Sequence, residues 1–272
     1  HGRVLIVAGS DSGGGAGIQA DVKTVTALGG YAATAVTAVT VQNTLGVTGI
    51  HPIPVQTVAA QIKAVLADIG ADVIKTGMLA SGELIDTVYS FLKREAPDLP
   101  LVVDPVMVAK GGTALVDRDA LHAMKSRLLS RATLLTPNLP EAEALAGRKI
   151  ETLHAMREAV KMLIDLGPKA VLLKGGHLPG DTIVDIYAGS DGTREWSGAR
   201  IDTRHTHGTG CTLASAIATG LAQGLGAVDS ISRARAFVRR AIETAPGLGG
   251  GHGPLNHAHT VRQFLSEPAT EE

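Results

Sequence analysis

Short apolar runs alternate along this chain with longer segments in which apolar residues recur at helical spacing. The short runs are rich in β-branched residues and are predicted to be strands. They span residues 4–7, 33–40, 72–75, 101–103, 133–135 and 170–173. The segments of helical period span residues 16–28, 55–69, 82–94, 152–166, 211–225 and 230–243. Mostly apolar strands that alternate with helices are typical of a parallel sheet covered on both faces.

One stretch departs from this alternation. Two short runs, 183–187 and 193–196, flank the turn Gly-Ser-Asp-Gly at 189–192, which predicts an antiparallel hairpin at the sheet edge. We therefore expect an α/β fold, a three-layer α/β/α sandwich with a mostly parallel central sheet. The length fits a single domain over residues 1–272, with 266–272 as a frayed tail.

Composition excludes several classes of protein. Lys and Arg number 25 against 26 Asp and Glu, a net charge of −1, so no overall field attracts nucleic acid or an anionic membrane. A single cysteine excludes an intrachain disulfide and a cysteine-based zinc site, and favours a reducing compartment. No apolar run is long enough to span a membrane, and the start of the chain does not resemble a signal peptide. We expect a cytoplasmic protein.

The unusual segments follow the predicted strands. In open parallel sheets, ligands bind beyond the carboxyl ends of the strands. The glycine-rich or polar segments at such ends are 8–15, 77–78, 104–107, 136–138 and 174–177. Their coincidence predicts a ligand site at this edge of the sheet.

The segment 206–212, Thr-His-Gly-Thr-Gly-Cys-Thr, leads directly into a small-residue helix. Backbone N–H groups of Gly208, Thr209 and Gly210 can converge there, and the helix dipole favours an anion at the same point. The dipole also predicts that the Cys211 thiol is biased toward thiolate. The alternative for Cys211 is a small buried apolar residue, and His205 and His207 are expected to be solvated loop residues.

The glycine run after the first strand does not fit a known nucleotide motif. Gly13, Gly15 and Gly17 lack the dinucleotide-binding spacing, and no Walker sequence is present. The loop therefore predicts a close backbone approach to a small ligand. Asp21, in the following helix, either hydrogen-bonds that ligand or is an acid that is solvated or pairs with the helix dipole.

Four polar residues at later strand ends predict a phosphate and metal site. Asp104 and Glu141 carry the carboxylates that Mg²⁺ prefers in company with water and phosphate oxygens. The alternative for Glu141 is a capping box with Asn138. Lys174 ends an apolar strand and can contact a phosphate. Such a set performs phosphoryl transfer by positioning and electrostatics, with Cys211 as the proton acceptor for a hydroxyl group.

The order and combination of these segments resemble hydroxymethylpyrimidine/phosphomethylpyrimidine kinases of thiamine biosynthesis, within the ribokinase-like fold. The resemblance spans nearly the whole chain. It rests on residues 9–21 (GSDSGGGAGIQAD), 42–44 (QNT), 75–78 (KTGM), 104–107 (DPVM), 136–142 (TPNLPEA), 174–177 (KGGH) and 207–212 (HGTGCT).

The resemblance implies ATP-dependent phosphorylation of 4-amino-5-hydroxymethyl-2-methylpyrimidine and then of its monophosphate, with magnesium as cofactor. It also implies which residues act. The pyrimidine pocket would be lined by Gly9, Asp21, Gln42, Met78, Val106 and Cys211. Magnesium and ATP would be bound by Asp104, Asn138, Glu141, Lys174 and Thr209. Cys211, with the turn Gly208, Thr209 and Gly210, would form the catalytic centre, where most ribokinase-like enzymes have Asp as the base.

Several points stay open at this stage. Lys110, on a glycine-flanked loop, either closes over phosphate or is solvated. Some related enzymes have Glu at the position of Gln42, so pyridoxal kinase is the alternative activity, and a non-catalytic pyrimidine or nucleotide sensor is a further one. The sequence leaves undecided whether a monovalent cation assists. The resemblance favours a homodimer.

Overall fold

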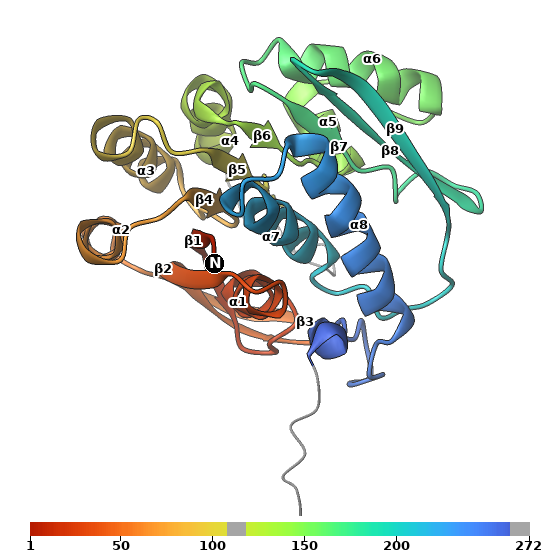
Figure 1. The fold of residues 1–272 in the computed structure, drawn as a ribbon, viewed down its shortest axis with the longest axis horizontal. Helices are drawn as coiled ribbons and strands as arrows, with labels where there is room; N and C mark the ends of the chain where they lie inside the picture. The colour runs from red at the N-terminus through yellow and green to blue at the C-terminus, as the bar shows by residue number, and fades with distance from the viewer. Residues whose placement is uncertain (108–117, 262–272) are drawn as a thin grey trace, which may run out of the picture.

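In the computed structural model, residues 1–107 and 118–261 are described, and these form one sheet flanked by helices (Figure 1). The nine strands of this part of the chain lie in the order β3-β2-β1-β4-β5-β6-β7-β8-β9. They are β1 (Arg3–Asp11), β2 (Tyr31–Asn43), β3 (Gly46–Pro52), β4 (Val73–Thr76), β5 (Leu101–Val103), β6 (Leu134–Leu135), β7 (Val171–Leu173), β8 (Thr182–Gly189) and β9 (Gly192–Ala199). Strands β2, β1, β4, β5, β6 and β7 pair in parallel, whereas β3, β8 and β9 each pair antiparallel to the preceding strand in the chain.

Helices cover both faces of the sheet. They are α1 (Gly17–Ala27), α2 (Val55–Asp68), α3 (Gly82–Glu95), α4 (Arg118–Ala123), α5 (Leu139–Ala146), α6 (Leu153–Ile164), α7 (Thr209–Ala222) and α8 (Ala227–Glu243). Helices α1, α7 and α8 pack together on one face, and α2, α3, α4 and α6 belong to the other. The expected α/β/α sandwich is confirmed.

The alternation of side chains along β1 explains the three layers. Leu5 and Val7 belong to the apolar core on the α2 and α3 face, whereas Val4, Ile6 and Ala8 pack with α7. Successive residues of a strand point to opposite faces, so a central strand needs apolar residues at nearly every position.

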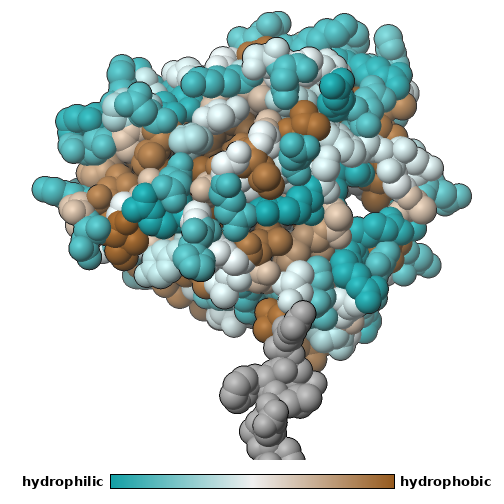
Figure 2. Space-filling view, in the orientation of Figure 1, coloured by the Kyte–Doolittle hydropathy of each residue, from teal (hydrophilic) through white to brown (hydrophobic). Residues whose placement is uncertain are grey.

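The outer helices bury only one stripe. In α8 the buried residues include Ile231, Ala234, Val238 and Ala241, which recur every three or four positions, and the other face carries charged residues. Accordingly, Figure 2 shows hydrophilic residues interspersed with small hydrophobic patches on this face of the molecule. In the described residues, no helix combines the length and apolar character that crossing a membrane requires.

The predicted strands and helices agree with the structure to within a few residues at their ends, and the hairpin of β8 and β9 lies at the sheet edge as expected. Strand β3, the helical segments from Arg118 to Arg131 and the short turn His257–Thr260 were not predicted, and α5 was implied only by the capping-box alternative for Glu141. Strand β3 contains two glycines and a proline and is mostly exposed, so it has no apolar pattern to detect. Lys110 and the tail at 266–272 lie outside the described residues.

The strand order changes direction beside β1. The chain passes from β1 to β2 on one side, and then crosses by β3 and α2 to β4 on the other side. The carboxyl ends of β1 and β4 therefore border a crevice, which is where open α/β sheets bind ligands.

Candidate active site

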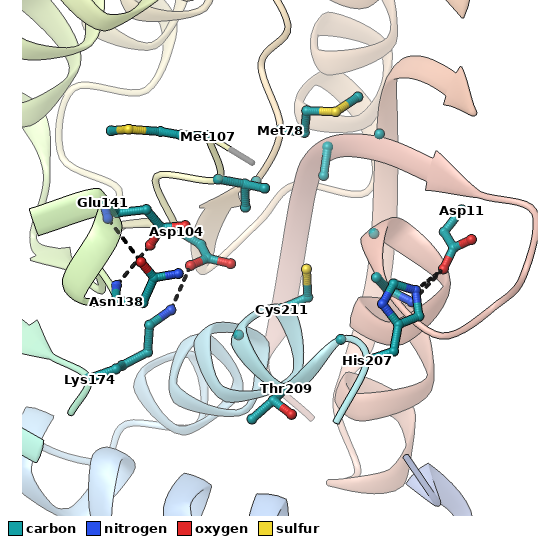
Figure 3. Close-up of a pocket in the computed structure, with 18 of the residues that line it drawn as sticks. Asp11, Met78, Asp104, Met107, Asn138, Glu141, Lys174, His207, Thr209 and Cys211 are labelled. Carbon is teal, nitrogen blue, oxygen red and sulfur yellow. Dashed lines mark hydrogen bonds and ion pairs between the residues drawn. The ribbon is translucent and has the colours of Figure 1, made fainter. Parts of the chain in front are cut away.

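A cleft of about 600 Å³ opens at the carboxyl ends of the parallel strands, above the N-terminus of α7 (Figure 3). It brings together segments that are far apart in the sequence. The expected site residues that line it are Gly9, Gln42, Met78, Asp104, Val106, Asn138, Glu141, Lys174, Gly208, Thr209, Gly210 and Cys211.

The turn before α7 requires glycine at position 208. Gly208 has φ +80° and is the N-cap residue of α7, and a side-chain carbon there would overlap the carbonyl oxygen of Gly15. The Thr209 hydroxyl donates to the Thr206 carbonyl at 2.7 Å. Added to Gly210, a side-chain carbon would lie 3.3 Å from Lys174 Nζ. The N-terminus of α7 thus lies close to the first glycine loop and to the lysine.

Cys211 occupies the first turn of α7, with its sulfur pointing into the cleft. The expectation of a thiol biased toward thiolate is wrong for this structure. Burial raises the pKa of Cys211 to about 12, and although the Lys75 charge lowers it, the nearby carboxylates of Asp21 and Asp104 raise it further. The thiol is therefore protonated at neutral pH, because desolvation outweighs the lowering effects of the Lys75 charge and of a hydrogen bond from the Gly17 backbone.

On one side of Cys211, Lys174 pairs with Asp104 (Figure 3). Lys174 Nζ lies 3.1 Å from Asp104 Oδ1, and the two side chains are 13% and 2% exposed. Burial by itself lowers the pKa of Lys174, but the charges of Asp104 and Glu141 outweigh it and hold the pKa above its ordinary value. The lysine is therefore a fixed positive charge at the cleft wall.

Glu141 serves as a helix cap and also faces the cleft. Its side chain accepts from the Asn138 backbone N–H at 2.8 Å, and Asn138 Oδ1 accepts from the Glu141 N–H at 2.9 Å, which confirms the capping box. Burial, together with the Asp104 charge, raises the pKa of Glu141 to about 7, despite the lowering effect of Lys174. The carboxylate caps α5, and its raised pKa means that its charge is only partly present at neutral pH.

The acids beside Lys174 can supply only a few protein ligands to a metal ion. In residues 1–107 and 118–261 there is no group of three or more His, Cys, Asp or Glu side chains that could hold a metal ion. Asp104 and Glu141 supply two carboxylates. This donor set fits Mg²⁺, which is commonly held by one or two carboxylates with water and substrate phosphates, and does not fit a metal that needs a closed protein shell.

Asp21 does not line the cleft, contrary to expectation. Its carboxylate is fully buried, with both oxygens 2.9 Å from Lys75 Nζ, and Oδ1 also accepts from the Ser215 hydroxyl at 2.6 Å. The Asp21 carboxylate therefore accepts from Lys75 of β4, and not from a ligand.

On the other side of Cys211, a histidine that the sequence analysis placed in solvent is buried (Figure 3). His207 Nε2 lies 2.9 Å from Asp11 Oδ2 and 3.2 Å from the Gln42 amide nitrogen. The pKa of Asp11 is lowered because hydrogen bonds from His207, Ala16 and Gly13 outweigh burial. The ionised carboxylate only accepts, so His207 Nε2 donates to it. Asp11 lies in the glycine-rich segment 9–21, and His207 directly precedes Gly208, so their place in glycine-rich segments was the available signal.

Gly208→Ala should disrupt this arrangement. A left-handed backbone costs a non-glycine residue about 1 to 2 kcal/mol, before the overlap with the Gly15 carbonyl is counted. We expect a lower melting temperature and loss of ligand binding in the cleft. Gly176→Ala is the matched control, because Gly176 lines the same cleft and has open space for a side-chain carbon. Equal melting temperatures for the two variants would contradict the role given to Gly208.

Comparison with known proteins agrees with these features. A family described as phosphomethylpyrimidine kinase matches residues 11–256. A hydroxymethylpyrimidine/phosphomethylpyrimidine kinase of Streptomyces coelicolor is 50% identical over 93% of each chain. A thiamine biosynthesis bifunctional protein of Geobacter sulfurreducens is 53% identical over 94% of this chain, which spans only 52% of that relative. The structure of Staphylococcus aureus pyridoxal kinase in complex with AMP-PCP and pyridoxal has a TM-score of 0.87 at 33% identity, covering 96% of this chain and 95% of the other. The chain belongs to the phosphomethylpyrimidine kinase family.

Proposed function

We propose that this chain phosphorylates 4-amino-5-hydroxymethyl-2-methylpyrimidine, and then its monophosphate, with ATP as the phosphoryl donor. The observation that carries the proposal is that the family match covers the segments that meet in one cleft from Asp11 onward, and leaves out only the cleft residues 8–10 of β1. The high identity to a full-length hydroxymethylpyrimidine/phosphomethylpyrimidine kinase supports both steps.

The nucleotide phosphates fit the wall formed by Lys174 and the N-terminus of α7. Lys174 is a fixed ammonium group in the cleft, and the first N–H groups of α7 lack intrahelical acceptors. Together they can hold the phosphates and stabilise the charge that develops on the transferred group. Binding of the ATP analogue AMP-PCP by the S. aureus pyridoxal kinase supports a nucleotide in this fold.

Magnesium belongs to the same wall in this proposal. Asp104 and Glu141 would hold it, and the bound ion would neutralise charge on the nucleotide phosphates. Without the ion, Lys174 balances part of the negative charge on both acids.

The substrate ring fits the opposite side of the cleft. The Gln42 amide has both a donor and an acceptor, which match the amino group and ring nitrogen of an aminopyrimidine. Met78 is 7% exposed and offers an apolar contact, and a side chain on Gly9 would meet the Met78 methyl carbon at 2.7 Å. Gly9 therefore lets the Met78 methyl group pack against the backbone of β1. Cys211 lies between the two sides, where the substrate hydroxyl would meet the phosphoryl group.

A second copy of the chain is proposed to cover the exposed face of β2. Val39 and Val41 are 45% and 63% exposed, and alternate residues of a strand share one face. Strand β3 beside them is a sheet edge. Uncovered apolar residues close to a sheet edge favour association with another chain.

Light scattering should give the mass of a homodimer, and Val41→Lys should shift the measured mass toward that of a monomer. A monomeric wild type would contradict the proposal.

The substrate is tested by measuring ADP release with three acceptors in parallel: the hydroxymethylpyrimidine, its monophosphate and pyridoxal. We expect turnover of both pyrimidines with magnesium present, and a lower kcat/KM for pyridoxal because its ring lacks the aminopyrimidine edge that Gln42 matches. Faster turnover of pyridoxal than of either pyrimidine would favour the alternative activity. No turnover of any acceptor by the folded protein would favour a sensor.

Cys211→Ala tests the proton acceptor. The variant should bind ATP as the wild type does, because the phosphate contacts come from Lys174 and backbone groups. Its kcat should fall by about 100- to 10,000-fold, the range for loss of a general base. Nucleotide titration and steady-state kinetics measure the two effects separately. An unchanged kcat would leave Cys211 with a packing role only.

A further inference from the structure

A buried ion pair lies beneath the cleft, between α1 and β4. Lys75 and Asp21 have fully buried side chains, joined by two contacts of 2.9 Å. Lys75 also borders the cleft and is the largest of the fully buried side chains in the described residues. A buried ion pair seldom stabilises a fold more than apolar residues of similar size would. Its position next to a ligand cleft therefore points to a functional role.

The ion pair faces the same side of α7 as Cys211. The Ser215 hydroxyl donates to Asp21 at 2.6 Å. Ser215 follows Cys211 by four residues, so the two side chains lie on one face of the helix, one turn apart. Helix α7 also packs on β4, the strand that carries Lys75. The ammonium group is thus held between the floor of the cleft and the helix that presents the thiol.

Charged groups from several elements surround the thiol. Lys75 of β4 lowers the pKa of Cys211, and Asp21 of α1 and Asp104 after β5 raise it. The influence of Lys75 is the largest of the three, although burial exceeds it. Lys174 after β7 is a further positive charge that interacts with the thiol. Without Lys75, the acids and burial would both disfavour a negative sulfur.

We propose that Lys75 is a positioning residue whose ammonium group stabilises negative charge on the Cys211 sulfur, and that the ion pair with Asp21 holds this ammonium group in place. The role in catalysis rests on the proposed function. There the thiol first loses its proton to solvent, and the thiolate then accepts the proton of the substrate hydroxyl. That oxygen bonds to the γ-phosphorus as the bond between the phosphorus and the leaving oxygen of ADP breaks.

The rate of thiol alkylation tests this inference without substrate or nucleotide. Cys211 is the only cysteine in the chain, so uptake of iodoacetamide reports this thiol alone. The reagent is uncharged, and only the thiolate reacts with it. The variant to compare with wild type is D21N/K75M, which removes both charges at nearly constant shape and leaves no unpaired buried charge. At fixed pH we expect alkylation about three- to tenfold slower, because the thiolate fraction falls while its intrinsic reactivity partly compensates.

S215A is the matched control, since it removes a hydrogen bond to Asp21 but no charge. Its alkylation rate should stay within about twofold of wild type. A variant that is merely loosened would expose the thiol and react faster, so an equal or faster rate in D21N/K75M overturns the proposal. If the double variant does not fold, K75M alone carries the same expectation, because the unpaired Asp21 carboxyl takes up a proton.

The alkylation experiment and the kinase assay test the two proposals separately. Slower alkylation in a protein that phosphorylates no pyrimidine would retain the electrostatic role of Lys75 and overturn the proposed reaction. Unchanged alkylation in an active kinase would overturn the role of Lys75 alone.

Discussion

The carboxylate of Asp11 joins the two glycine-rich segments on which the cleft depends. It ends β1 and accepts from the backbone N–H groups of Gly13, Gly15 and Ala16 at 2.7, 3.1 and 2.8 Å, which fixes the loop before α1. The same carboxylate accepts from His207, next to the turn that starts α7. One buried anion with four donors thus sets the distance between the loop and the helix N-terminus. At that distance the backbone of Gly208 lies against the Gly15 carbonyl oxygen, and there is no room for a side chain at position 208.

Charge in this site is paired across elements. Lys174 of one strand end balances Asp104 of another, and Lys75 of β4 balances Asp21 of α1. Each lysine keeps its proton because an acid lies in contact, which outweighs the lowering effect of burial on its pKa. The cleft therefore has fixed positive charges beside a thiol that burial holds neutral. The fixed positive charges suit the phosphates of the proposed reaction, and the sulfur is protonated at neutral pH.

Contacts between residues close in the sequence could be predicted, whereas contacts between distant residues could not. Asn138 and Glu141 formed a capping box because both partners lie within one helical turn, and such local geometry follows from spacing. The location of Lys174 and Asp104 at the same edge of the sheet, after β7 and β5 on either side of β6, followed from the parallel sheet. In contrast, the pairing of Asp21 with Lys75 joins residues 54 positions apart, and that of Asp11 with His207 joins residues 196 apart. The apolar periodicity of a sequence carries no information on contacts between such distant residues. Asp21 was therefore expected to contact a ligand, and His207 to be solvated.

The sequence by itself determined the alternation of strands and helices, the glycine positions and the strand ends that carry polar residues, because these depend on local preference and on apolar pattern. Only the tertiary structure decided which of the polar groups face the cleft and which neutralise one another beneath it. It also decided the state of Cys211, since the helix N-terminus is visible in the sequence but the burial of the thiol is not. Desolvation depends on what surrounds a group in three dimensions, and for this thiol it is the larger effect.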